Sequence, residues 1–175
     1  MRIAYLTETY PPELNGVSLT VERTVRFLRA RGHNVELIRP RQPGEAELDA
    51  NDELRTAGWP IPVYREMRFG VSRIAPLVRR FRETTPELVH LATPGPLAWA
   101  ALAAARALGI ATTSDFRTNF HQYSRYYGLG ALATPALGLL RRFHNLTQQT
   151  FVPTRATARE PVSYTHLTLP TTERV

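Results

Sequence analysis

The side chains best suited to chemistry gather in one polar loop in the second half of the chain. Arg117 supplies a fixed positive charge, Asn119 an amide and His121 an imidazole. Such groups bind hydroxyl-rich or anionic ligands through neutral and charge-assisted hydrogen bonds. Because loops carry sites more often than cores do, we expect these three residues to serve a ligand. The alternative is a loop in which Phe116 and Phe120 close a hydrophobic edge and Arg117 pairs with a carboxylate; for the two phenylalanines we favour it.

A second candidate site lies near the amino terminus, after a short apolar run at Ile3–Leu6 that predicts a buried strand. The next segment contains Pro11, Pro12 and Asn15-Gly16, which can continue neither a strand nor a helix. In an open α/β sheet such a loop holds the ligand, with free backbone N–H groups at the start of the next helix facing an anion. The length of the loop and Gly16 favour this function over an ordinary connection.

Other common site chemistries lack their sequence patterns. There is no G-x-G-x-x-G after the first strand and no G-x-x-x-x-G-K-[ST], so the fingerprints of dinucleotide and P-loop nucleotide binding are missing. The chain has no cysteine, its five histidines show no metal-ligand spacing, and no serine lies in a G-x-S-x-G elbow. We therefore expect neither a metal nor a cofactor.

The chain carries a formal net charge of +7, and all 22 basic residues are arginine. These arginines are scattered over the expected helices and loops, without aromatics interleaved on one element, so we expect no nucleic-acid partner. Anionic partners such as sugar nucleotides or an acidic membrane surface fit the charge. No apolar run approaches the roughly 20 residues of a spanning helix and no leader pattern is evident, so we expect a cytoplasmic protein.

The elements that must position these residues alternate between strand and helix. The expected strands are Ile3–Leu6, Asn34–Ile38, Leu88–Leu91, Ile110–Thr113 and Phe151–Val152. The expected helices are Ser18–Leu28, with Ser18 as N-cap and Gly32 after its end, Val71–Glu83, Pro96–Leu108 and Leu132–Leu146. This alternation implies right-handed βαβ units. The fold class that we expect is therefore α/β: a Rossmann-like parallel sheet flanked by helices.

Two segments break the alternation. Arg39–Pro62 is polar and rich in proline and glycine, so we expect a surface excursion with one short strand at Ile61–Val63. Pro161–Thr171 ends the pattern abruptly and resembles the translation of a transposon-type sequencing-library adapter, a known contaminant at the ends of assembled genes. We expect residues 1–160 to form the native, incomplete domain and 161–175 to be a non-native tail. A genuine tail is the alternative, because the segment contains residues that favour strands.

Three loops follow strands of the expected parallel sheet, namely Thr7–Val17, Ala92–Pro96 and Ser114–Tyr127. The carboxyl ends of parallel strands share one edge of the sheet, so side chains from these loops can converge there. The two candidate sites are thus expected to be one site.

Seven short motifs occur in a fixed order along residues 1–160. They are Met1–Ala4, Asn15–Val17, Arg31–Val35, Pro86–His90, Pro94–Leu97, Phe116–Phe120 and Phe151–Thr154. Each motif is weak by itself, but together they resemble the N-terminal domain of GT-B retaining glycosyltransferases, family four. Within this family the chain is similar to the branch of lipid- and polyol-directed mannosyl- and sulfoquinovosyl-type transferases.

The resemblance implies two Rossmann-like domains facing across a cleft, with this chain as the acceptor side and the other domain holding most of a GDP- or UDP-hexose donor. The substrate-binding residues that it implies are Asn15, Gly16, Val17, Thr93, Pro94, Gly95, Thr118, Asn119 and Tyr123. The family commonly has histidine where this chain has Arg117. We expect Arg117 to contact a sugar hydroxyl or phosphate, with His121 compensating, and these two are the expected catalytic residues. The family's donor-binding cations belong to the other domain, so we expect no turnover from this chain alone.

The main hypothesis is a fragment of a retaining glycosyltransferase that moves a hexose to a lipid or polyol hydroxyl, with peripheral contact to the inner face of the membrane. Ile74–Phe81 and Leu132–Phe143 pair apolar faces with arginine, as interfacial helices do, although packing on the sheet explains both patterns better. One alternative is a non-catalytic sugar- or anion-binding module. A weaker one is another Rossmann-like enzyme, such as a nucleotide-sugar epimerase.

Overall fold

The computed structural model describes residues 1–13, 15–45, 52–61, 64–116, 130–153 and 167–168. The chain divides into two compact units, Met1–Thr112 and Thr113–Val175.

The first unit is built on a mostly parallel sheet with strand order β4-β3-β2-β1-β5. The strands are β1 (Arg2–Leu6), β2 (Asn34–Pro40), β3 (Glu53–Ile61), β4 (Tyr64–Val71) and β5 (Leu88–Leu91). β1 pairs in parallel with both β2 and β5, and β2 pairs in parallel with β3. Only β4 runs antiparallel, as the neighbour of β3. β1 therefore has a parallel neighbour on each side, which explains why four of its five residues are buried.

Helix α1 (Gly16–Ala30) covers one face of this sheet. Its buried Val21 and Val25 pack against Ile3 and Tyr5 of β1, which point to the same face because alternate strand residues share a side. Burying each of these valines contributes about 1.5–3 kcal/mol. Gly32, after the end of α1, has φ +81°, so the expected left-handed glycine is confirmed.

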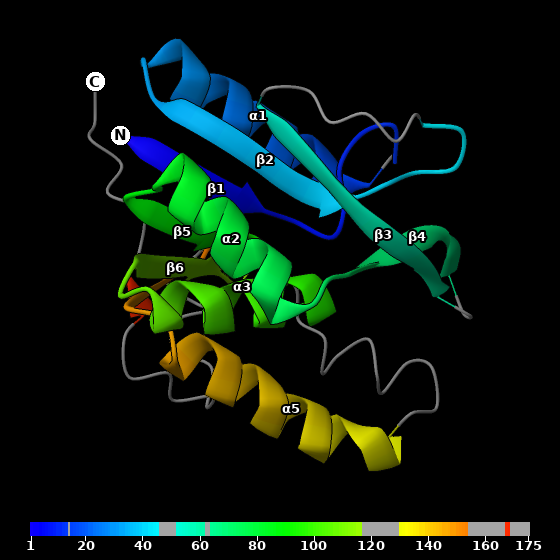
Figure 1. Cartoon of the computed structure of the whole chain (residues 1–175). Coiled ribbons are helices and arrows are strands. Elements are labelled where there is room, and N and C mark those ends of the chain that lie inside the picture. Colours follow the sequence, from blue (N-terminus) through cyan, green and yellow to red (C-terminus); the bar gives the residue numbers. More distant parts are fainter. Residues whose placement is uncertain (14, 46–51, 62–63, 117–129, 154–166, 169–175) are drawn as a thin grey trace. The chain divides into compact units, whose positions relative to one another are not determined.

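Helices α2 (Ile74–Thr84) and α3 (Pro96–Ala107) pack against one another on the opposite face. Figure 1 shows α2 in front of the strands and α1 behind them. Leu77 and Phe81 of α2 are almost completely buried, so this part of the helix faces the protein interior. The burial of Leu77 and Phe81 supports the interpretation of Ile74–Phe81 as a packed helix, although Ile74 itself is 48% exposed.

The second unit has its own short parallel arrangement, β6-β7-β8. Its elements are β6 (Ala111–Asp115), which begins at the unit boundary, α5 (Gly130–Asn145), β7 (Gln149–Phe151) and β8 (Leu167–Thr168). β8 lies within the expected non-native tail, whose origin stays a prediction. In the part of the chain that the structure describes, no helix is long and apolar enough to cross a membrane.

The surface excursion expected at Arg39–Pro62 is wrong. Glu53–Ile61 and Tyr64–Val71 instead form a two-stranded antiparallel ribbon, and the helix expected from Val71 begins at Ile74. β2 pairs only with the first residues of β3, and the rest of β3 pairs with β4 alone. The ribbon therefore continues past the carboxyl end of β2 (Figure 1). Proline in β3 hid the strand from the sequence pattern, yet an edge ribbon tolerates it.

Candidate functional site

The loop after β1 ends at the N-terminus of α1, where Asn15 caps the helix. Its Oδ1 accepts the N–H of Ser18 at 2.8 Å, and its backbone oxygen accepts the N–H of Leu19 at 3.1 Å. The expected cap, Ser18, is wrong because Ser18 is already inside the helix; asparagine caps as well as serine does.

Gly16 is the first residue of α1 and is exposed. A Cβ atom placed on it would have no neighbour within 4 Å, and its φ lies outside the left-handed region. Among the described residues, none accepts a hydrogen bond from the N–H of Gly16 or Val17. The first turn of α1 thus has two backbone donors without an acceptor among the described residues, at the positive end of the helix dipole, and such a position suits an anion.

The loop after β5 reaches the same edge of the sheet. The backbone N–H of Glu8 donates to Thr93 Oγ1 at 2.7 Å, and this contact joins the loop after β1 to the loop after β5. Gly95 is the N-cap of α3, and Pro94 lies beside it. The structure therefore joins the two segments that carry expected residues: Asn15, Gly16 and Val17 lie where the first loop ends and α1 begins, and Thr93, Pro94 and Gly95 lie in the second loop.

The N-terminus of α3, unlike that of α1, is already occupied by a carboxylate. Glu8 is buried and accepts the N–H of Leu97 at 3.0 Å through Oε1 and the N–H of Gly70 through Oε2. A Cβ atom on Gly95 would overlap this carboxylate, so glycine is required there to make room for Glu8. Burial raises the pKa of Glu8 to about 7, although its backbone N–H donors lower it.

Two further side chains of this rim escaped the sequence analysis. Glu13 accepts hydrogen bonds from Thr9, Asn15 and Gln42, and the buried Gln42 follows the end of β2. Sequence position offered one signal for Glu8, Glu13 and Gln42, since all three follow a predicted strand at its carboxyl end. It did not show what they contact.

Five expected residues lie outside the described part of the chain: Arg117, Thr118, Asn119, His121 and Tyr123. Their roles stay predictions. Phe116, just before them, is buried and meets the ring of His144 edge-on at 5.5 Å, so its expected packing role is confirmed.

The second unit contains a buried polar cluster centred on Ser114. Its Oγ lies 2.9 Å from Nδ1 of His144 and 3.0 Å from the hydroxyls of Thr147 and Thr150. Burial lowers the pKa of His144 to about 4, against the raising effect of Asp115. A neutral imidazole and hydroxyl groups closed off from solvent make this cluster part of the core.

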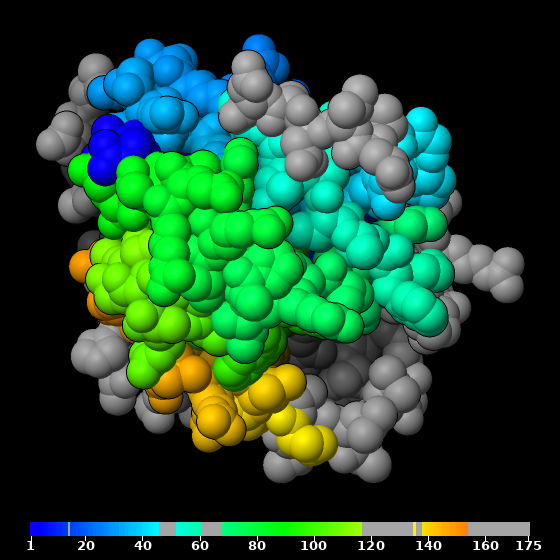
Figure 2. All heavy atoms as spheres, in the orientation of Figure 1, coloured from blue at the N-terminus to red at the C-terminus, as the bar shows by residue number. Residues whose placement is uncertain are grey.

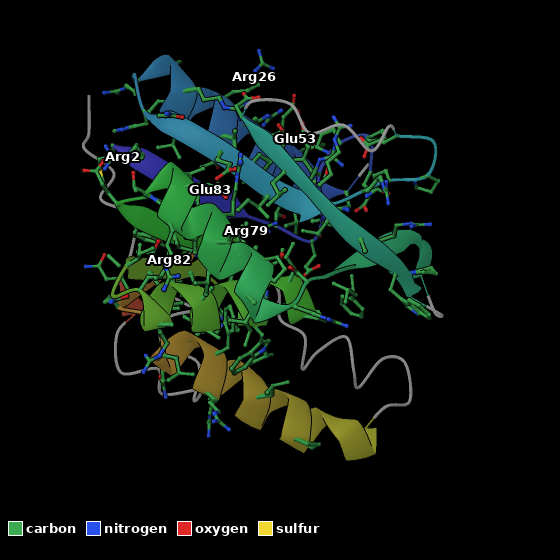
Figure 3. All side chains as sticks on the ribbon, in the orientation of Figure 1. Arg2, Arg26, Glu53, Arg79, Arg82 and Glu83 are labelled. Atoms are coloured by element: carbon green, nitrogen blue, oxygen red, sulfur yellow. The ribbon has the colours of Figure 1, made fainter. Side chains whose placement is uncertain are left out.

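The ribbon carries an exposed apolar face. Trp59 pairs with Phe69 and Ala57 with Val71, so these four side chains share one side. Trp59 is 69% exposed, Val71 49% and Phe69 39%. A hollow of about 310 Å³ adjoins this face, lined by residues of the ribbon and α2. Figure 2 shows the ribbon and α2 side by side at the surface, and Figure 3 shows Arg79, Arg82 and Glu83 along the outward side of α2.

Comparison of the sequence with known proteins identifies its family. The model of Glycosyltransferase Family 4 matches residues 14–167. A GDP-mannose-dependent alpha-mannosyltransferase of Mycobacterium tuberculosis is 32% identical over 162 residues, which cover 90% of this chain and 43% of the relative. Sulfoquinovosyl transferase SQD2 of Arabidopsis thaliana is 22% identical over 93% of this chain and 32% of its own length. An alpha-monoglucosyldiacylglycerol synthase of Acholeplasma laidlawii is 28% identical over 72% of this chain and 32% of its own length. The chain thus spans less than half the length of these relatives.

Solved structures show the same fold. Sucrose-phosphate synthase from Thermosynechococcus elongatus superposes with a TM-score of 0.62 at 12% identity, over 96% of this chain and 47% of that protein. UDP-GlcNAc 2-epimerase from Methanocaldococcus jannaschii gives a TM-score of 0.56 at 12% identity, over 97% and 45%. The expected Rossmann-like α/β fold is confirmed, and it matches the N-terminal half of GT-B enzymes. With a family model that spans most of its length, the chain belongs to Glycosyltransferase Family 4.

Proposed function

We propose that this chain is the acceptor-side half of a retaining glycosyltransferase that moves a hexose from GDP- or UDP-hexose to a hydroxyl of a lipid or polyol. The relatives named above support the donor and acceptor classes, since their names include GDP-mannose and a glucosyldiacylglycerol product. Because the chain spans less than half of them, the activity belongs to the protein that also contains the donor-binding half.

The observation that carries the proposal is the contrast between two helix N-termini on one rim. Glu8 fills the N-terminus of α3, while the first turn of α1 has an uncovered glycine and two backbone donors. Of these two helix N-termini, only that of α1 is therefore available to an external anion. A diphosphate leaving group bound there would be stabilised by the N–H groups of Gly16 and Val17 as its negative charge develops.

The ribbon supports the proposed contact with a membrane and changes the element expected to make it. α2 buries Leu77 and Phe81, whereas the ribbon exposes Trp59 and Phe69, and Arg79 and Arg80 of α2 line the hollow next to Ala57 and Val71 of the ribbon. Tryptophan favours membrane–water interfaces, and arginine favours anionic lipid. We propose that the exposed apolar face of the ribbon touches the lipid surface from which the acceptor is taken.

A transfer assay tests the proposed function. The whole protein containing this chain is incubated with GDP-mannose or UDP-glucose and with diacylglycerol vesicles, and hexose incorporation into lipid is measured. We expect transfer from one of the two donors and none from the 175-residue chain by itself. Binding of a donor by the whole protein without turnover, across lipid and polyol acceptors, would instead favour a non-catalytic sugar- or anion-binding module.

A further inference from the structure

Glu13 lies three positions before Gly16, and its carboxylate is held by three side-chain donors. The hydroxyl of Thr9 donates to Oε2 at 2.5 Å and the amide of Asn15 to the same oxygen at 3.4 Å. The amide of Gln42 donates to Oε1 at 2.5 Å. Thr9 and Asn15 belong to the loop itself, but Gln42 follows the end of β2. The carboxylate therefore ties the loop to another strand.

Gln42 is a fixed anchor for this contact. It is buried, and its backbone N–H donates to Oε2 of Glu45 at 2.8 Å. Glu45 in turn binds the guanidinium of Arg39 through both oxygens, at 2.7 and 2.8 Å. Arg39 has a side chain only 4% exposed and also pairs with Glu53 at 2.6 Å. A bidentate pair with a buried guanidinium holds a defined geometry.

Glu13 also contacts residues at the first turn of α1. The Ser18 hydroxyl donates to the backbone oxygen of Glu13 at 2.5 Å, while Asn15 both donates to the Glu13 carboxylate and accepts the Ser18 N–H. Polar contacts thus run without a break from Arg39 through Gln42 and Glu13 to the residues on either side of Gly16.

We propose that Glu13 and Gln42 are positioning residues: their contact holds the loop so that the N–H groups of Gly16 and Val17 stay available to a diphosphate. This inference rests on the proposed function. A free carboxylate so close to Gly16 would repel an anion. Its three donors instead hold the Glu13 carboxylate toward the end of β2. Glu13 then favours anion binding by fixing the loop, and this effect outweighs the repulsion from its charge.

The direction in which Glu13→Ala changes anion affinity tests this idea on the 175-residue chain. Inorganic pyrophosphate is titrated while the amide signals of Gly16 and Val17 are followed by NMR. Removing a negative charge should tighten anion binding if charge alone matters. We expect Glu13→Ala and Gln42→Ala to weaken it at least about fivefold, as the loss of one hydrogen-bonded constraint would. Glu13→Gln keeps an acceptor oxygen and should retain the wild-type affinity or exceed it. Equal or tighter binding by Glu13→Ala overturns the proposal.

Glu36→Ala is the matched control, because it also removes one negative charge and one close contact, to Arg80 at 2.6 Å, away from this loop. It should lower the melting temperature and leave pyrophosphate affinity unchanged. If wild type shows no shifts at Gly16 and Val17, the proposed anion role of α1 fails. Amide hydrogen exchange then tests separately whether the Glu13–Gln42 contact holds the loop. Faster exchange at Ser18 in Glu13→Ala, but not in Glu36→Ala, supports this role, and equal exchange refutes it.

Discussion

The neighbours of Gly95 and of Gly16 differ, so the two glycines are needed for different reasons. Gly95 lacks a side chain because the Glu8 carboxylate fills that space, whereas Gly16 has no described neighbour that excludes a Cβ atom. The absence of a side chain is thus structural at Gly95. At Gly16 no described atom demands it, which agrees with the proposed ligand-binding role of this position.

Gly95→Ala should destabilise the protein by about 2–3 kcal/mol, because the new methyl group overlaps Glu8 and overpacks the N-terminus of α3. Chemical denaturation measures this loss. In a Glu8→Ala background the same change should cost much less, since the overlap is gone. Gly138→Ala is the control: it is a helical glycine with open space, and it should be neutral or stabilising. Equal losses at both glycines would contradict the proposed role of Glu8.

His144 should make stability depend on pH. Its folded-state pKa of about 4 lies below the ordinary value of 6.5, so the unfolded chain binds more protons between these two values. Stability from this group is complete above pH 6.5 and is lost toward pH 4, by about 3 kcal/mol. Glu8 acts in the opposite direction: its pKa is raised to about 7, so its contribution falls as pH rises from 4.5 to 7.

Urea denaturation at pH 4.5 and at pH 7 separates the two groups. Relative to wild type, His144→Gln should lose the rise in stability with pH, and Glu8→Gln should lose the fall. A His144→Gln profile identical to wild type would show that the imidazole is not kept neutral by the fold.

At the scale of elements, the ribbon exposes an apolar face that packing within the described chain does not account for. The opposite side of the ribbon is used by the fold, since a Cβ atom on Gly70 would meet Leu97 and one on Gly58 would meet Arg41. On the other side, Trp59, Phe69 and Val71 are exposed to solvent. A membrane surface covers such a face without a further protein domain.

Trp59→Ala should reduce co-sedimentation of the chain with anionic vesicles several-fold, because interfacial burial of one large aromatic contributes on the order of 1 kcal/mol or more. Phe27→Ala is the control: Phe27 is an exposed aromatic on α1 with Arg31 over its ring at 5.0 Å, so it matches the aromatic-plus-arginine character on another element. Equal absence of the wild-type chain from anionic and neutral pellets would remove the membrane proposal.

At the scale of the whole enzyme, Gly16 and Arg117 are expected to matter for turnover more than for stability. In the protein that contains both halves, Gly16→Val should lower turnover by about a hundredfold, since a displacement of about 1 Å near the reacting centre has that effect. Its melting temperature should change little, because no described atom lies within 4 Å of the new Cβ. Arg117→Ala should behave in the same way. Unchanged turnover with a lowered melting temperature would show these positions to be structural.

The sequence by itself determined the order of elements wherever hydrophobic periodicity was clear. The apolar run of β1, the helix expected over Ser18–Leu28 and the glycine after its end are local features, and the structure confirms all three. It also predicted that the loops after β1 and β5 meet at one rim, because parallel strands leave no other arrangement.

Tertiary structure alone decided how that rim is used. Glu8 finds its donors 62 and 89 positions away, at Gly70 and Leu97, and Glu13 meets Gln42 after 29 positions. The ribbon likewise depends on pairing between two strands that proline and glycine obscure in the sequence. Local patterns decide which segments become strands and helices, but contacts between distant segments decide which helix N-terminus is already filled by the protein and which remains open to a ligand.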